Sequence, residues 1–234
     1  MRALSSVRSL GAIDLRSIAR DPLLRWMVVL TPALGLLFRF AVPPTAVVLR
    51  ERLGFDLAPY ETLLASFLPL AVAGMVGTVL GFLLLDQRDD QTLIALLVTP
   101  LSLTDYLRYR VFVLVPPCVA LTCVAVPLAG LVETSPLQLV VAAFVAAPLA
   151  PIYALFLGAF AANKVQGLAL VKAAGIVLLP AVGSYFVSGR WQIAFGLLPH
   201  YWPLKVFWLF DAGAVAAALL HGVVGLLWQP CWWR

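Results

Sequence analysis

The side chains with the clearest chemical potential are the acids and bases of one segment, Asp86–Arg110, which reads DQRDDQTLIALLVTPLSLTDYLRYR. Three of its carboxylates, those of Asp86, Asp89 and Asp90, lie within five positions of each other. Carboxylates at the end of a membrane helix can hold divalent cations and a diphosphate, as in membrane phosphotransferases. Such a site requires a second set of acids, and acids such as Glu133 and Asp211 are predicted on the other side of the membrane. Metal-dependent phosphotransfer therefore stays an alternative hypothesis.

The same segment predicts a short helix with an apolar face. Asp89 and Asp90 can cap a helix that begins near Gln91, because acids are favoured at the positive end of the helix dipole. Proline ends that helix, since the residue before a proline disfavours helical geometry. The residues concerned are Thr92, Leu93, Ile94, Leu96, Leu97, Thr99 and Pro100. Exposed leucines flanked by charges predict a docking surface for a protein partner.

The composition places this charged segment in a membrane protein. The 234-residue chain is 63% hydrophobic and only 12% charged, and its mean hydropathy is +1.01. Long uncharged runs exclude a disordered chain, and the absence of strict alternation excludes an outer-membrane β-barrel. The basic residues lie beside apolar segments rather than on one soluble face, so the pI of 9.4 does not predict a nucleic-acid partner.

The predicted fold is an all-α membrane protein in a single domain over residues 1–234. Residues 1–25 form an amphipathic helix at the membrane interface, because Leu4, Val7, Leu15 and Ile18 share one helical face. Six transmembrane helices follow, and the charged segment connects the second to the third. Their predicted limits are about 26–42, 62–85, 111–132, 137–162, 168–187 and 212–228. We expect Pro43 and Pro44 to end or kink the first and Pro148 and Pro151 to kink the fourth.

Lysine and arginine predict the orientation. With the N-terminus in the cytoplasm, eleven of the sixteen basic residues lie inside and four lie outside, so both termini are predicted to be cytoplasmic. The stretch from Ser188 to Asp211 then lies outside. It is rich in aromatic residues, which predicts one or two short helices along the outer interface.

Three stretches of this sequence resemble the permeases of ABC-2-type transporters. The first is D-x-R-D-x-x-T-L-x-A-L-L-V-T-P-L-S in the charged segment, and the second is N-K-V-Q-G-L at 163–168. The third is L-P-H-Y-W-P at 198–203. The resemblance extends over most of the chain and is strongest to a small six-span subgroup that includes fluoroquinolone exporters.

The resemblance implies a permease subunit in the bacterial plasma membrane. Such subunits pair as homodimers or heterodimers and bind separate ABC ATPase subunits, which hold the ATP and Mg. The residues implied to contact the ATPase are Asp86, Arg88, Asp89, Asp90 and the coupling helix Thr92–Pro100. The chain has no G-x-x-x-x-G-K-[ST] motif, so ATP hydrolysis is expected on the partner and no cofactor is expected here. A membrane assembly or immunity component without transport has the same expected architecture.

Few polar side chains lie in the predicted spans, which favours a hydrophobic or amphipathic substrate such as a drug or a lipid-like molecule. Candidates for a transport pathway are Arg39, Ser184, Tyr185 and His221. Arg39 lies near the end of the first span, where it can also reach the lipid headgroups. We expect His200 to be a surface or packing residue.

Overall fold

The computed structural model describes residues 20, 22–90 and 112–233, and every element in that part of the chain is helical. The predicted coupling helix and all but a few residues of the predicted amphipathic helix over 1–25 lie outside the described residues. The longer elements are α2 (Pro22–Leu53), α3 (Glu61–Asp89), α6 (Val115–Ala129), α7 (Pro136–Ala146), α8 (Leu149–Phe160), α9 (Lys164–Ala174), α11 (Tyr201–Asp211) and α12 (Val215–Trp228). The short ones are η1 (Ala58–Tyr60), η2 (Gly175–Val177), α10 (Leu178–Gly183), η3 (Ser184–Phe186), η4 (Arg190–Leu197) and η5 (Gln229–Trp233).

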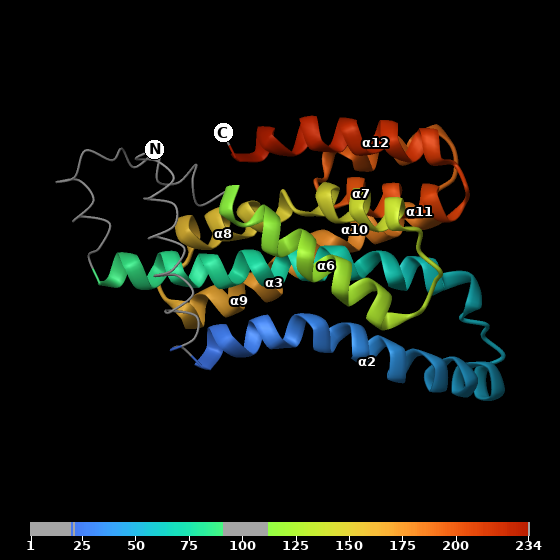
Figure 1. Ribbon diagram of the computed structural model, residues 1–234, viewed down its shortest axis with the longest axis horizontal. Helices are drawn as coiled ribbons and strands as arrows, with labels where there is room; N and C mark the ends of the chain where they lie inside the picture. The colour runs from blue at the N-terminus through green and yellow to red at the C-terminus, as the bar shows by residue number, and fades with distance from the viewer. Residues whose placement is uncertain (1–19, 21, 91–111, 234) are drawn as a thin grey trace.

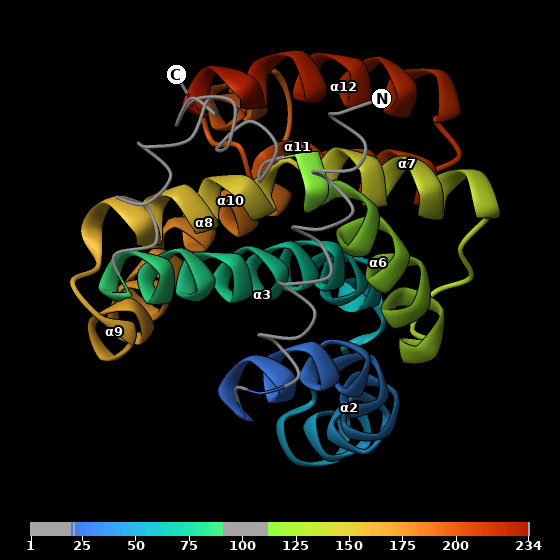
Figure 2. The same ribbon diagram turned by 60° about the vertical axis from the view of Figure 1, so that its left-hand side comes forward.

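The helices run lengthwise beside one another in a bundle, with α2 and α12 on opposite sides (Figures 1 and 2). In the described part, four helical segments are long and apolar enough to cross a membrane: Val28–Leu53, Ala58–Asp89, Pro136–Phe160 and Lys164–Phe186. Two further apolar helices, Val115–Ala129 and Val215–Cys231, are shorter. The helical membrane-protein class is therefore confirmed, while the count of six crossings stays a prediction.

The centre of the bundle is α3, which packs against α2, α6, α8 and α11. Seventeen of its residues are buried, and they include Leu68, Val72 and Phe82. Its closest neighbour is α8, because Gly77 allows the two backbones to meet. A Cβ at this position would overlap the carbonyl oxygen of Ala150. Small residues at membrane helix interfaces act in this way, since they let van der Waals packing replace the missing hydrophobic driving force.

The first helix differs from its predicted limits. Pro43 and Pro44 do not end α2, which curves but continues to Leu53 (Figure 1). Proline has helical φ, so its cost in a helix comes from the lost N–H donor and from steric contact with the preceding turn. The next turn contains an extra hydrogen bond in which the Thr45 hydroxyl donates to the carbonyl of Ala41 at 2.6 Å.

The third and sixth predicted helices are shorter than expected. Within the described residues, α6 extends over 15 residues and α12 over 14, against predicted limits of 111–132 and 212–228. Both limits of α6 have a local cause. Pro116 and Pro117 stand at the start of α6, and Gly130 follows it in the left-handed conformation with φ 59°.

The fourth predicted span is interrupted between α7 and α8, at Ala147 and Pro148. The buried backbone carbonyl of Val145 accepts a hydrogen bond from far along the chain, because the Gln229 side-chain amide donates to it at 3.0 Å. Gln229 is completely buried at the end of α12. An unsatisfied carbonyl is costly inside a membrane protein, so this single side chain stabilises the break.

The short helices predicted between Ser188 and Asp211 are present as η4 and α11, but the prediction that they lie along the outer interface is wrong for α11. This helix is buried against α3, α7 and α12. One end of α11 is held where Thr62 donates to Asp211 at 2.6 Å. The turn between η4 and α11 lies near the C-terminal end of α12, where the indole of Trp228 donates to the Leu197 carbonyl at 3.5 Å.

η4 and α11 therefore form a re-entrant hairpin that enters from the end of the bundle near Thr62 and returns to it. The aromatic residues of α11 are buried instead, among them Tyr201, Phe207 and Trp208, whereas Trp191 in η4 is 81% exposed. The indole of Trp208 donates to the Ser66 hydroxyl at 3.0 Å, which satisfies its polar atom inside the core.

We predict that Gly77→Ala lowers the free energy of unfolding by about 1–3 kcal/mol, because the added methyl forces α3 away from α8. Thermal unfolding of the purified protein in detergent measures this loss. Gly183→Ala is the matched control, since a Cβ there would meet no atom within 4 Å. Equal melting temperatures for the two variants would contradict the close packing.

We predict that Gln229→Leu destabilises the protein by about 1–3 kcal/mol, because it leaves the Val145 carbonyl buried without a donor. Leu227→Ala is the control two positions away, since Leu227 is 73% exposed. Thermal unfolding in detergent compares the melting temperatures of the two variants. Equal losses of stability in Leu227→Ala and Gln229→Leu would contradict a stabilising role of the Gln229 amide.

Candidate functional site

The charged end of α3 lies against the turn between α8 and α9, and we call this contact the α3/α9 junction. It consists of Asp86–Asp90 and residues 161–167. Arg88 is its main link, because its guanidinium Nη2 donates to the carbonyls of Ala161 at 3.0 Å and Ala162 at 2.7 Å. These carbonyls stand at the C-terminal end of α8, where a cation is favoured by the helix dipole.

A second link joins α3 to the start of α9. The Lys164 ammonium lies 3.0 Å from the Asp86 carboxylate, and both side chains are partly exposed. The turn itself is held by side-chain caps. Asn163 Oδ1 accepts from the backbone N–H of Gln166 at 2.9 Å, and Gln166 Oε1 accepts from that of Ala162 at 2.7 Å. This reciprocal capping fixes where α9 begins.

Gly167 lets α9 approach α3 closely. A Cβ at this position would stand 2.7 Å from the ring carbon Cε1 of Phe82, which is completely buried. Four of the five residues of the N-K-V-Q-G motif thus have a structural role: Asn163 caps, Lys164 pairs, Gln166 caps in return, and Gly167 makes room. The sequence predicted both charged motifs on one side of the membrane but not their direct contact.

The predicted partner-contact residues divide into three groups. Asp86 and Arg88 are engaged within the chain at the α3/α9 junction. Asp89 and Asp90 are exposed at the end of α3, where the backbone N–H of Asp90 donates to the carbonyl of Asp86 at 2.8 Å. The remaining candidates lie outside the described residues: Thr92, Leu93, Leu96, Leu97, Thr99 and Pro100.

The alternative of a metal site on the three aspartates gains no support. Across the described residues, no three His, Cys, Asp or Glu side chains are grouped closely enough to hold a metal ion. Asp86 also faces a lysine ammonium, which occupies the position that a cation would take beside this carboxylate.

The four predicted pathway residues do not form one cluster, although Ser184 and Tyr185 are neighbours in η3 (Ser184–Phe186). Arg39 is exposed beside the end of α6, where a Cβ on Gly130 would stand 3.0 Å from its Nη1. The Ser184 hydroxyl donates to the Ala181 carbonyl and that of Tyr185 to the Pro59 carbonyl, while Nδ1 of His221 bonds the carbonyl of Ala217 within α12. None of the four lines either of the cavities described below.

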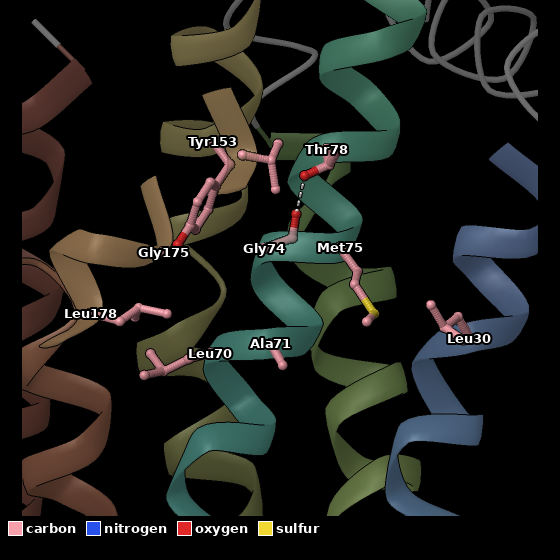
Figure 3. Close-up of a pocket in the computed structure, with 10 residues that line it drawn as sticks. Leu30, Leu70, Ala71, Gly74, Met75, Thr78, Tyr153, Gly175 and Leu178 are labelled. Carbon is pink, nitrogen blue, oxygen red and sulfur yellow. Dashed lines mark hydrogen bonds between the residues drawn. The ribbon is translucent and has the colours of Figure 1, made fainter. Parts of the chain in front are cut away.

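Two cavities of about 300 and 350 Å³ flank α8, and both include Tyr153 in their walls. The first lies between α2, α3 and the α9–α10 region, and Figure 3 shows Leu30 and Met75 on facing helices. The second lies between α8, the end of α9 and the tip of the re-entrant hairpin. Its walls are Ile152, Tyr153, Phe156, Ala173, Ala174, Val177, Leu198, Pro199 and His200. Cavities of this size with mostly apolar walls suit hydrophobic or amphipathic molecules.

A buried polar pair joins α8 to the hairpin tip. The Tyr153 hydroxyl and Nε2 of His200 are 3.0 Å apart, and the two residues are only 9% and 6% exposed. The prediction of a surface or packing residue left the burial of His200 open and did not identify its partner, and Tyr153 was not identified as a candidate. The one signal available in the sequence was a polar ring in each of two apolar stretches.

We predict that Arg88→Ala loosens the α3/α9 junction, because the carbonyls that end α8 lose their charged donor. The expected loss is about 1 kcal/mol, reduced by exposure of part of the site. Hydrogen–deuterium exchange of residues 161–167 should rise, whereas Arg50→Ala, which removes an exposed arginine from the last turn of α2, should leave it unchanged. Unchanged exchange in Arg88→Ala would contradict the link.

Comparisons with known proteins identify the family. Residues 14–233 match the model of a family described as fluoroquinolones export permease protein Rv2686c-like. The chain is 35% identical over 235 residues to the fluoroquinolones export permease protein Rv2686c of Mycobacterium tuberculosis strain ATCC 25618 / H37Rv. It is equally similar to the protein MT2760 of strain CDC 1551 / Oshkosh, which has the same description. Each alignment covers 96% of this chain and 93% of the relative.

No solved structure gives a significant match to the chain. The family match extends over nearly the whole helical bundle, including the α3/α9 junction and both cavities. The chain therefore belongs to the Rv2686c-like family of fluoroquinolone export permeases, and it is a transport subunit rather than an enzyme.

Proposed function

We propose that this chain is an ABC-2-type permease subunit that exports a hydrophobic or amphipathic molecule across the bacterial plasma membrane, driven by a separate ABC ATPase. The observation that carries the proposal is the α3/α9 junction. Two charged motifs that resemble the intracellular loops of such permeases meet there, at one end of the bundle. ATP and Mg are held by the partner ATPase, and no cofactor is assigned to this chain.

The junction supports a route for mechanical coupling. Residues 91–111 follow directly from the end of α3, so a push on the coupling helix acts first on that end. Arg88 and the Asp86–Lys164 pair connect α3 to both α8 and α9. These helices form walls of the two cavities, so the displacement reaches the space available to a substrate.

In this arrangement the four charged residues at the end of α3 have two different roles. Asp86 and Arg88 transmit movement inside the permease, because their side chains are engaged there. Asp89 and Asp90 contact the ATPase, because their side chains are exposed at the point where the chain leaves the bundle. We assign the rest of the docking surface to the predicted apolar face of Leu93, Leu96 and Leu97, and we place both chain termini on the same, cytoplasmic side.

The proposed substrate class follows from the cavities and the relatives. Both cavities have mostly apolar walls with few polar groups, which suits an aromatic drug better than an ion. The relatives are named as fluoroquinolone exporters, and fluoroquinolones are aromatic and amphipathic. We extend this drug class, and pairing with a second permease subunit, to this chain.

We predict that the full-length permease co-purifies in detergent with the ABC-type ATPase of its gene neighbourhood, and that the pair lowers fluoroquinolone accumulation in cells. The double variant Asp89→Lys and Asp90→Lys should weaken ATPase association at least tenfold, because charge reversal at a contact opposes docking.

The control variant reverses two acids at the opposite end of the bundle, Glu51→Lys and Glu133→Lys, which are exposed. It should bind the ATPase as the wild type does. The coupling proposal fails if no ATPase is captured, or if both double variants bind equally well.

A further inference from the structure

The wall of the second cavity includes a buried polar side chain whose hydrogen-bonding capacity is only partly satisfied within the protein. His200 lines this cavity at the tip of the re-entrant hairpin and is 94% buried. Its Nε2 is paired with the Tyr153 hydroxyl. Its Nδ1 is buried and has no hydrogen-bond partner among the described residues.

The pairing determines what Nδ1 can offer. A neutral imidazole has one donor and one acceptor nitrogen. When the Tyr153 hydroxyl donates to Nε2, the proton lies on Nδ1, and the buried N–H requires an acceptor. Buried donors without acceptors are rare in native proteins because they lose the hydrogen bonds of water, so such a donor beside a cavity indicates a ligand group.

The first cavity does not show this feature. Thr78 lines it, and its hydroxyl donates to the Gly74 carbonyl at 2.7 Å, as the dashed line in Figure 3 shows. The Tyr153 hydroxyl, which belongs to both cavities, is already bonded to His200. Of the two cavities, only the second has a wall residue with a buried polar atom that lacks a hydrogen-bond partner in the described part of the chain.

We propose that the second cavity binds the transported molecule, and that His200 Nδ1–H donates a hydrogen bond to a carbonyl or carboxyl oxygen of that molecule. The proposal rests on the proposed export function. Phe156, Ile152 and Leu198 contact the flat aromatic body of the ligand. Tyr153 is a positioning residue that holds the imidazole and selects its tautomer.

The position of the cavity gives the ligand a way in. Ala173 and Val177 are exposed on its rim, and they lie near the middle of the membrane-crossing segment Lys164–Phe186. The cavity therefore opens sideways between α8 and the α9–η2 segment, toward lipid. An amphipathic molecule dissolved in the bilayer reaches it without passing through water, and a volume of about 350 Å³ lies within the range of small-molecule sites.

The test is equilibrium binding of a fluoroquinolone to the purified full-length permease without any ATPase, followed by the anisotropy of the drug's own fluorescence. We expect His200→Phe to weaken binding about tenfold, because it keeps the ring but removes the donor. His200→Asn keeps an amide near the Nδ1 position and should restore part of the affinity. His200→Gln, whose amide lies near the Nε2 position, should not.

A second set of variants tests the cavity without altering its polar groups. Ala174→Leu fills the second cavity and should weaken binding at least tenfold. Ala169→Leu adds the same volume at an exposed position on α9 that lines neither cavity, and should leave the dissociation constant within about twofold. Thermal unfolding confirms that each variant is folded.

Three results would overturn the proposal. The first is wild-type affinity in both His200→Phe and Ala174→Leu. The second is a larger loss from Ala71→Leu, which fills the first cavity, than from Ala174→Leu. The third is no drug binding to a permease that still exports the drug with its ATPase. Binding with the expected variant pattern but no ATPase-driven export would support this site while contradicting the proposed function.

Discussion

The close contact between α3 and α8 is the constraint on which the rest of the structure depends. Gly77 lets the Ala150 carbonyl approach α3 so closely that no larger residue fits. In lipid, apolar helices gain little from leaving the solvent, so tight packing must supply the attraction. α3 and α8 therefore act as one body, and α2, α6, α9 and α11 are placed around it.

The second constraint is that buried polar atoms need partners where water is absent. The break in the fourth segment is stabilised by Gln229, and the indole of Trp208 is satisfied by Ser66. At the α3/α9 junction, Arg88 satisfies the last carbonyls of α8. The same rule makes His200 informative. Four buried side-chain atoms lack a hydrogen-bond partner in the described residues, namely Thr122 Oγ1, Gln138 Nε2, Gln229 Oε1 and His200 Nδ1, and His200 is the one of these residues that lines a cavity.

Much of this architecture could be predicted, because it follows from composition and local pattern. Uncharged runs indicated apolar helices, Pro148 and Pro151 indicated the break between α7 and α8, and the charged segment indicated one specialised end of the bundle. α11 could not be predicted, because a short aromatic helix has the same composition at a membrane interface as inside a bundle. The contacts of Gln229 and Tyr153 could not be predicted, because their partners lie 84 and 47 residues away in the chain.

The sequence by itself determined the membrane class, the family resemblance and the expected need for a separate ATPase, since these depend on composition and on motifs of neighbouring residues. Only the tertiary structure decided that Asp86 and Arg88 are engaged within the chain, and that the stretch over 190–211 turns back into the bundle. It also brought His200 onto Tyr153 beside a cavity. Such contacts join distant segments, and their position depends on how whole helices pack rather than on any local residue pattern.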